Sequence, residues 1–471
     1  MNDGELPDMT DFDQYQSPFS WRYASPEMRR IWSETHKRVL WRRLWVALAR
    51  AQQPYGLVTA AQLAELDNHT NDIDLPRALE IEDEIHHDLM AELKTFAGQC
   101  PTAGGVLHIG ATSMDIEDNA DALRMGEALD LTLTRLDQLL LVLAGQIEQT
   151  ASLTVMAFTH IQPAEPTTLG YRLAFTAQDM LADRQALRSL RTGLRGKGFK
   201  GAVGTAAAYG DLIGMENFSL FEQNLSEALD LPFFNISTQT YPRRQDYQVI
   251  SALAGLGAAL YKLAFDLRLL QSPPIGELNE PFAKKQVGSS AMPFKRNPIN
   301  SEKIDSLARS LAVMPQVAWN NAAHSLLERT LDDSANRRTS LPEAFLITDE
   351  LLRTAIRILQ DLDIHPQAIE RNLQTYAPFA ATERVLMAAA RAGADRQQMH
   401  ELLRTHALAA WQAVQAGQPN PLIASLQADP QITQYLPAAA IDALANVNAY
   451  TGIAPQRARQ MADHIREELV A

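Results

Sequence analysis

Apolar residues recur at heptad-like spacing through the middle of the chain. One stripe alternates steps of four and three residues: Leu129, Leu133, Leu136, Leu140, Leu143 and Ile147. The same alternation runs from Val249 to Leu270, and Phe345, Leu352 and Leu359 repeat at intervals of seven. Such stripes form the seam of a helix bundle or coiled coil. The sequence therefore predicts long amphipathic helices over these stretches, the last ending before His365-Pro366.

Capping residues and helix breakers predict further helices at both ends of the chain. Ser25 followed by Pro26 is a typical N-cap with proline at the first helical position. We expect ordered sequence to begin there, with one helix over about residues 28–53 and another over about 88–97. Beyond Pro366 the pattern changes to shorter segments interrupted by Gly393, Gly417, Pro419, Pro421 and Pro430. This change predicts a small helical C-terminal domain.

Strand signals are weak, and the predicted fold class is all-α. Only residues 154–159 and 233–240 have a strand-like pattern. Helices of about twenty residues are roughly 30 Å long. One chain cannot easily cover several such rods on every side, so we expect their remaining apolar faces to pack against other subunits.

Composition and charge indicate a soluble protein of the cytoplasm. Hydrophobic residues make up 46% of the 471, charged residues make up 21%, and the net charge is -14. This balance disfavours general binding to nucleic acid or anionic membranes. The single cysteine, Cys100, excludes an internal disulfide and fits a reducing compartment. Residues 1–14 show no secretory signal, and apolar runs such as 139–145 are too short to cross a bilayer.

The most distinctive polar segment is Gly288-Ser-Ser-Ala-Met-Pro-Phe-Lys-Arg-Asn-Pro298. Its glycine and prolines disfavour a regular helix or strand. The remaining hydroxyls, free N–H groups and two cations suit binding an anion and holding a hydroxyl ready for deprotonation. The alternative is a polar surface turn before a helix that starts near Pro298.

Four more clusters could supply a site, and each has a structural alternative. Residues 84–88, Glu-Ile-His-His-Asp, could instead be a solvated helix surface, where adjacent histidines point about 100° apart. In residues 108–115 the hydroxyls of Thr112 and Ser113 suit a carboxylate or phosphate, or plain helix capping. His160, in residues 159–168, lies between a strand-like run and a proline-bounded turn, and could transfer a proton or be structural. Residues 328–338 hold three arginines beside Asp332 and Asp333, which fits an oxyanion site or an ion-paired turn.

The chain lacks the sequence motifs of several kinds of functional site. The chain has no HExxH and too few cysteines for a thiolate metal site, so we expect no metal. Gly-rich phosphate loops and a GxSxG elbow are also missing. A serine in an anion-binding loop, a histidine, a lysine and several arginines fit the removal of a proton next to a carboxylate while a leaving group is protonated elsewhere.

The loop 288–298 resembles the GSSxMPxKxNP signature of the fumarase/aspartase superfamily. Residues 108–115, HIGATSMD, and 159–168, THIQPAEPTT, resemble its two other shared blocks in the expected order. Four further segments resemble the adenylosuccinate lyase family, nearest its eukaryotic type: RYASPEM from Arg22, HHD from His86, STQTYPRR from Ser237 and ERTLDDSANRR from Glu328. The resemblance extends from about residue 22 to 338, and the C-terminal region is compatible with it.

The resemblance implies an all-α fumarase/aspartase-like fold with three domains, at residues 1–111, 112–365 and 366–471. A long central helix bundle would form the core of a homotetramer whose active sites are shared between subunits. The implied activity is that of a carbon–nitrogen lyase in purine biosynthesis, which releases fumarate from adenylosuccinate to give AMP. The same site would convert succinyl-aminoimidazole-carboxamide ribotide to aminoimidazole-carboxamide ribotide. The implied partner is a small purine nucleotide, and no cofactor is implied.

The resemblance also implies residue roles. Ser289 would be the general base, in preference to Ser290, because it matches the position of the superfamily's usual base. His160 would protonate the leaving nitrogen, and Glu302 would orient His160. Lys295 and the loop amides would stabilise the dianionic aci-carboxylate that forms.

His87 is counted among the catalytic residues because it would contact the phosphate or carboxylate region of the substrate. Arginine and serine residues would hold the phosphate and succinyl anions, while Thr112, Ser113 and Gln239 would bind the succinyl portion. The full implied set of substrate-binding residues is Arg22, Tyr23, His86, His87, Asp88, Thr112, Ser113, Gln239, Lys295, Asn297, Lys303, Arg329, Ser334 and Arg338.

Two rival functions are weighed against this one. Another lyase of the superfamily, such as argininosuccinate lyase, aspartase or a cycloisomerase, is disfavoured by the segments at 22–28 and 328–338. A non-catalytic relative is disfavoured because Ser289, Lys295, His160 and Glu302 are all present.

Overall fold

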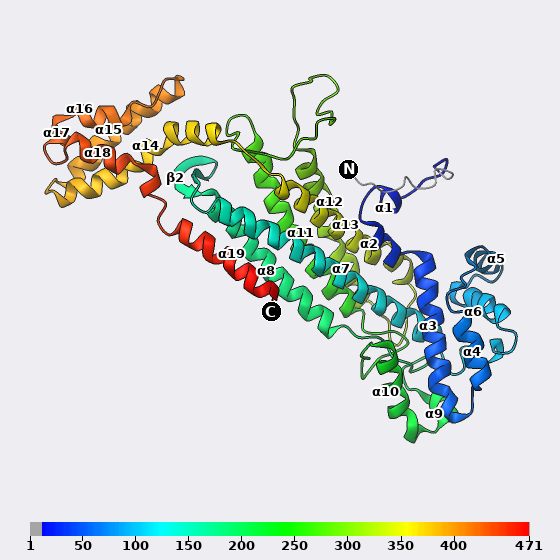
Figure 1. The fold of residues 1–471 in the computed structure, drawn as a ribbon. Coiled ribbons are helices and arrows are strands. Elements are labelled where there is room, and N and C mark those ends of the chain that lie inside the picture. Colours follow the sequence, from blue (N-terminus) through cyan, green and yellow to red (C-terminus); the bar gives the residue numbers. More distant parts are fainter. Residues whose placement is uncertain (1–11, 471) are drawn as a thin grey trace. The chain divides into compact units, whose positions relative to one another are not determined.

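The computed structural model describes residues 12–470. The expected absence of a secretory signal concerns residues that lie mostly outside this range. The described chain, drawn as a ribbon in Figure 1, is mostly helical. It divides into two compact units. The first unit contains the described part of Met1–Arg135, together with Asp183–Ala258 and Leu307–Arg353. The second contains Leu136–Ala182, Ala259–Ser306 and the described part of Thr354–Ala471. The predicted three-domain division at residues 111 and 365 stays a prediction.

The described part of the first unit begins with six helices, three of which contribute to an aromatic core. They are α1 (Pro18–Trp21), α2 (Pro26–Ile31), α3 (Glu34–Gln52), α4 (Ala60–Asn68), α5 (Leu75–Ile85) and α6 (Asp88–Gln99), with 3-10 turns at Gln53–Tyr55 and Gly104–Val106. Later in the chain, α9 (Ala207–Ile213), a 3-10 turn at Met215–Asn217 and α10 (Phe218–Leu229) add to this core. Trp41, Trp45, Phe96 and Phe221 are buried in it.

The predicted helix start at Ser25 is confirmed. The Ser25 hydroxyl accepts the Met28 N–H, and Pro26 is the first helical residue. The single helix predicted over about 28–53 is wrong in its continuity, because the chain breaks at Trp32-Ser33. The Ser33 hydroxyl accepts the His36 N–H and so caps a second helix, α3. The expected start of ordered sequence near Ser25 is also too late, since α1 precedes it.

The apolar stripes lie on three long helices, α7 (Ser113–Gln149), α11 (Arg244–Gln271) and α13 (Ser334–Gln360). Two further long helices are α8 (Leu169–Gly193) and α12 (Ile299–Ala323). The boundaries of both units fall inside these helices. Most members of the predicted stripes are buried, including Leu136 and Leu140 on α7, Leu253 and Leu256 on α11, and Leu352 on α13. The prediction of long amphipathic helices is confirmed.

The expectation that every apolar run is too short to cross a bilayer needs a correction at helix α11. Its mean hydropathy reaches 1.4 over an 18-residue window, so by length and composition it could cross a membrane. Half of that window is buried inside the protein, and the stripe from Val249 to Leu270 is buried throughout. The long apolar character of α11 is that of a core helix.

The second unit contains a hairpin and a helical C-terminal region. Strands β1 (Thr154–Thr159) and β2 (Gln162–Thr168) pair antiparallel, and β3 (Leu278–Asn279) pairs with β4 (Asp363–Ile364). The strand predicted at 154–159 is confirmed. The one at 233–240 is wrong, since only Phe233 forms an isolated bridge, with Gly196.

The C-terminal helices are α14 (Pro366–Arg391), α15 (Arg396–Gln415), α16 (Leu422–Ala428), α17 (Pro430–Thr433), α18 (Ala438–Ala445) and α19 (Ala454–Val470), with a 3-10 turn at Val447–Ala449. Helices α14 to α18 share a core that includes Val385, Leu403, Leu426 and Ile441. The predicted breaks at Gly393, Gly417, Pro419 and Pro421 fall between helices, whereas Pro430 is the first residue of α17. Helix α14 is 26 residues long, which is longer than the short segments predicted.

Candidate active site

A polar cavity of about 420 Å³ in the first unit gathers many of the predicted binding residues. Five parts of the first unit reach this cavity: the end of α5, the start of α6, the start of α7, a loop at Gln239, and the segment that leads into α13. Its lining residues are Glu82, His86, His87, Asp88, Thr112, Ser113, Met114, Glu117, Gln239, Arg329, Leu331, Ser334 and Arg338. Residues far apart in the sequence thus line one cavity.

The two adjacent histidines lie between helices and not inside one, which corrects their interpretation as part of a helical pattern. His86 ends α5 in the left-handed region, at φ 56°, and His87 is the N-cap of α6. The His87 Nδ1 accepts the Met90 N–H at 3.4 Å, so in neutral His87 the proton is on Nε2. That Nε2 lies 3.4 Å from the Ser113 Oγ, at the cavity. Helix capping therefore fixes the tautomer and the direction of the ring.

Asp88 and Arg338 form an ion pair at the cavity, with 2.8 Å between Arg338 Nη2 and Asp88 Oδ2. Burial alone would raise the pKa of Asp88, but the Arg338 guanidinium, the charge of Lys37 and the Leu89 N–H together hold that pKa below its usual value. A bound anion would therefore share Arg338 with Asp88.

The start of α7 is anchored by the buried carboxylate of Asp115. This carboxylate accepts the Thr112 N–H at 3.1 Å, and it also accepts the Lys200 N–H and the Tyr209 hydroxyl. Lys197 forms an ion pair with it. Thr112 and Ser113 thus reach the cavity from a rigid helix end.

The arginines of residues 328–338 lie in two different surroundings. Arg329 and Arg338 line the cavity, whereas Arg337 is buried and bonds to Asp246 and to the Tyr241 hydroxyl, at 2.8 Å each. The predicted ion pairing is present at Arg337, and an oxyanion site at Arg329 and Arg338 stays a prediction.

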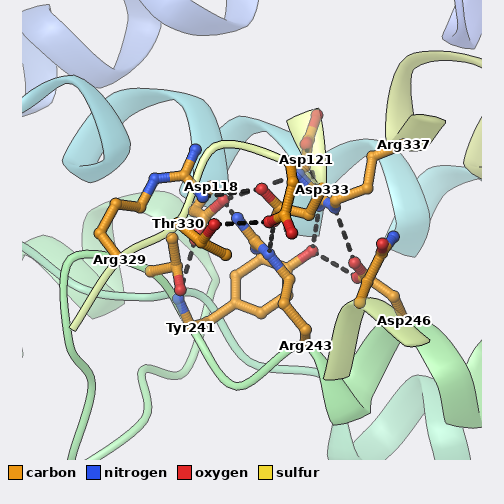
Figure 2. Close-up of polar contacts among 12 residues, drawn as sticks. Asp118, Asp121, Tyr241, Arg243, Asp246, Arg329, Thr330, Asp333 and Arg337 are labelled. Carbon is orange, nitrogen blue, oxygen red and sulfur yellow. Dashed lines mark hydrogen bonds and ion pairs between the residues drawn. The ribbon is translucent and has the colours of Figure 1, made fainter. Parts of the chain in front are cut away.

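Figure 2 shows how a buried network supports this segment. Asp333 accepts from Arg329 at 2.8 Å and from Arg243 at 2.7 Å. Arg243 in turn donates to Asp118 on α7 at 3.0 Å. The guanidinium of Arg329 is held in place through these contacts.

The loop 288–298 belongs to the second unit and has a defined hydrogen-bonded shape. The Ser289 Oγ accepts the N–H groups of Ala291, at 3.3 Å, and Met292, at 3.1 Å. Asn297 donates from Nδ2 to the Gly288 carbonyl at 2.9 Å. At Gly288 a Cβ would lie 2.1 Å from the Lys295 carbonyl oxygen, so only glycine permits this closure. Lys295 itself is exposed.

The predicted proton-transfer pair also lies in the second unit. His160 is exposed in the two-residue turn between β1 and β2, at φ 54°, and Ile161 follows at φ 59°. Glu302 is in the first turn of α12 beside Lys303, and its carboxylate is 3.9 Å from Arg268. Within the described part of this one chain His160 and Glu302 are not hydrogen-bonded to each other, and their pairing stays a prediction.

Arg22 and Tyr23 follow directly after α1 and do not line the 420 Å³ cavity of their own chain. The exposed Arg22 guanidinium lies over the rings of Trp21, at 5.7 Å, and Tyr23, at 5.9 Å. Gln239 does line the cavity, and its N–H donates to the Glu328 carbonyl at 3.2 Å.

Comparisons with known proteins show the family of this chain. Residues 13–312 match the family described as lyase, and residues 378–461 match the adenylosuccinate lyase C-terminus. Adenylosuccinate lyase of Schistosoma mansoni is 40% identical over 406 residues, 84% of each chain. Adenylosuccinate lyase of Saccharomyces cerevisiae is 36% identical over 458 residues, 95% of this chain and 94% of the relative. The chain belongs to the adenylosuccinate lyase family.

Solved structures show that this family member shares its fold with other lyases of the superfamily. The 3-carboxy-cis,cis-muconate lactonizing enzyme of Pseudomonas putida is 25% identical with a TM-score of 0.86, covering 97% of this chain and 100% of that one. Fumarate lyase from Mesorhizobium sp. BNC1 is 23% identical with a TM-score of 0.81, covering 96% and 99%. The predicted all-α fumarase/aspartase-like fold is confirmed.

Glu117 is one of the cavity residues of this adenylosuccinate lyase family member that the sequence did not predict. Glu117 follows Ser113 by one helical turn of α7, so both side chains lie on the same helix face. Burial and then the charges of Asp88, Asp121 and Asp118 raise the pKa of Glu117 to about 8. The i, i+4 spacing from Ser113 was the available signal, but an acidic residue on a helix is ordinarily solvated.

Proposed function

We propose that this protein cleaves adenylosuccinate to AMP and fumarate, and cleaves succinyl-aminoimidazole-carboxamide ribotide to aminoimidazole-carboxamide ribotide and fumarate. The observation that carries the proposal is identity of 35–40% to curated adenylosuccinate lyases, over 84–95% of the chain. The polar cavity supports it, because arginine, serine and threonine side chains suited to a polyanion converge there.

Binding of the substrate's anions falls to the first unit in this proposal. Arg329, Ser334 and Arg338 hold phosphate and succinyl oxygens, since a guanidinium matches both groups in geometry and charge. Thr112, Ser113 and Gln239 bind the succinyl portion, and His86, His87 and Asp88 complete this wall of the site. Arg22, Tyr23 and Lys303 are further anion-binding residues that do not line this cavity in one chain.

Ser289 removes the proton next to the succinyl carboxylate. The two N–H groups that its Oγ accepts would stabilise the alkoxide form, which favours Ser289 over Ser290. The product of this step is a dianionic aci-carboxylate. Lys295, Asn297 and the loop amides stabilise it, and one such preorganised donor is worth about 3–4 kcal/mol.

His160 then protonates the nitrogen of the leaving purine or imidazole, while Glu302 orients the imidazole. The carbon–nitrogen bond breaks, fumarate takes the new double bond, and the leaving nitrogen keeps the proton that His160 supplies. No cofactor enters this scheme, because the proton transfers and the charge stabilisation all come from side chains and backbone amides.

We also propose a cytoplasmic homotetramer with active sites shared between subunits. Large apolar side chains are exposed on the long helices, including Phe175 on α8, Phe265 on α11 and Trp319 on α12. Exposed apolar surface of this kind marks an association surface. A subunit contact there would cover the helix faces that one chain leaves open.

The proposal is tested by following the loss of adenylosuccinate absorbance with purified enzyme. Argininosuccinate and aspartate serve as control substrates. We expect turnover of adenylosuccinate only. Turnover of a control substrate without turnover of adenylosuccinate would assign the protein to another lyase activity of the superfamily.

A further inference from the structure

Glu117 forms part of the wall between two cavities of the first unit. The 420 Å³ cavity and a smaller one of about 100 Å³ have four lining residues in common: Asp88, Glu117, Ser334 and Arg338. Ser334 and Arg338 are proposed to hold a substrate anion. A nucleotide held by them lies against Glu117 as well.

The Glu117 carboxyl is free to bind a ligand. Within residues 12–470 it makes no hydrogen bond or ion pair, whereas Asp88 is paired with Arg338 and Asp121 with Arg337. Its raised pKa, about 8, has burial as the main cause and three neighbouring aspartates as the next. At neutral pH the side chain is therefore mostly a neutral acid with an O–H to donate.

We propose that Glu117 binds the nucleotide as a neutral carboxylic acid, which donates a hydrogen bond to an anionic oxygen of the ligand held by Ser334 and Arg338. This inference deepens the proposed function and rests on its choice of a purine nucleotide as ligand. An ionised Glu117 would repel that oxygen and would offer no donor. The affinity for the nucleotide should therefore fall as the pH rises and Glu117 loses its proton.

Charged groups face Glu117 from every neighbouring element. Those that line its cavities or act on its charge are Glu34 and Lys37 on α3, Glu82 and His86 at the end of α5, His87 and Asp88 at the start of α6, Asp118, Asp121 and Arg124 on α7, and Arg329, Arg337 and Arg338 around the start of α13. The nearest cation, Arg338, already pairs with Asp88. A further anion at the ligand site would favour the protonated form of Glu117 even more.

The test measures the Kd of AMP by calorimetry from pH 7 to 9, with the assembled full-length enzyme. The AMP phosphate has its second pKa near 6 and stays dianionic over this range. Since binding takes up a proton above the pKa of Glu117, the wild-type Kd should rise about 5- to 10-fold from pH 7 to 9. Glu117→Gln keeps a donor but cannot ionise, so its Kd should vary by less than about twofold.

Glu343→Gln is the matched control. Burial also raises the pKa of Glu343, but this residue lines neither cavity. The control should reproduce the wild-type rise in Kd. A wild-type Kd that stays flat, or an equal rise in Glu117→Gln, overturns the proposal.

Thermal unfolding without ligand keeps the test independent of binding. For an acid whose pKa is raised by folding, stability is lost as pH rises from the unfolded value towards the folded one. The Tm of Glu117→Gln minus the Tm of wild type should therefore increase as the pH rises from 5 to 8. If this Tm difference does not change with pH, Glu117 is not a neutral acid in the folded protein. Cleavage of adenylosuccinate is assayed separately. If the enzyme cleaves adenylosuccinate but its Kd for AMP does not change with pH, only the role of Glu117 is contradicted. If the Kd changes with pH but adenylosuccinate is not cleaved, only the proposed function is contradicted.

Discussion

The two proposed proton-transfer residues are held by backbone features that a sequence pattern does not show. His160 and Ile161 both have positive φ, in a hairpin turn where asparagine and glycine are the usual residues. Such a conformation costs on the order of 1–3 kcal/mol for a residue other than glycine. The surrounding hairpin holds it, and the imidazole projects from a fixed backbone. Ser289 instead depends on two amide donors from its own loop.

Removal of either proton-transfer group should abolish most activity without unfolding the protein. Both side chains lie on surface turns, so His160→Ala and Ser289→Ala should each retain the native Tm. Loss of a positioned acid or base costs about 10²–10⁴ in rate. We expect kcat for adenylosuccinate to fall by that factor in each variant.

Ser290→Ala is the control, because the neighbouring hydroxyl is exposed and its loop position is otherwise the same. Its kcat should stay near wild type. The opposite result, with Ser290→Ala inactive and Ser289→Ala active, would reassign the general base.

Chemistry at the residue scale was predictable only where residue type and motif agreed. Asp88, Ser113 and Arg338 were predicted and line one cavity. The different surroundings of the neighbours Arg337 and Arg338 could not be predicted. Arg337 is buried through its bonds to Tyr241 and Asp246, which lie about a hundred residues earlier in the sequence. Nor could the sequence show that Glu117 lies near three aspartates and, within residues 12–470, has no hydrogen-bond or ion-pair partner.

The long helices could be predicted from the periodicity of apolar residues, but the breaks between helices could not. The heptad stripes predicted α7, α11 and α13 because a long helix is stabilised mainly by burial of a continuous apolar face. The break between α2 and α3 depends on one hydroxyl, that of Ser33, which competes locally with helix propagation. Residues 233–240 have strand-like composition but no neighbouring strand to pair with beyond one bridge.

The loop 288–298 allows a prediction at the scale of an element. A Cβ at Gly288 would meet the Lys295 carbonyl oxygen at 2.1 Å, a backbone contact that no side-chain rotation relieves. Gly288→Ala should open the loop and move Ser289, so kcat should fall at least tenfold. Because the loop is exposed, the Tm should change by only a few degrees.

Gly98→Ala serves as the control for the effect of an added methyl group. Gly98 lies in α6, and no atom comes within 4 Å of the position that a Cβ would take there, so alanine fits. Helix propensity predicts a gain of about 0.5–1 kcal/mol in the free energy of unfolding, with unchanged kcat. Equal kcat for Gly288→Ala and wild type would show that closure of the loop does not position Ser289.

At the scale of the whole molecule, exposed apolar surface is the main feature that one chain leaves unexplained. Two cavities of the second unit, of about 390 and 360 Å³, are both lined by Tyr171 and Phe175 of α8. Apolar grooves of this size on long helices fit association with further copies of the chain. An oligomer in which each site draws residues from several chains would also give Arg22 and Tyr23, which lie outside their own chain's cavity, a neighbouring site to complete.

Shared sites predict that two inactive variants restore each other. If His160 and Ser289 of one active site come from different subunits, a mixed tetramer of His160→Ala and Ser289→Ala contains some sites with both residues intact. Mixing the variants after mild dissociation should then recover up to about a quarter of wild-type kcat, as random association places both intact residues in one site in that fraction of cases. Each variant treated alone is the control and should stay inactive. Subunit exchange is verified by native mass spectrometry with one variant isotopically labelled. If exchanged tetramers show no recovered activity, both residues of each site come from one chain.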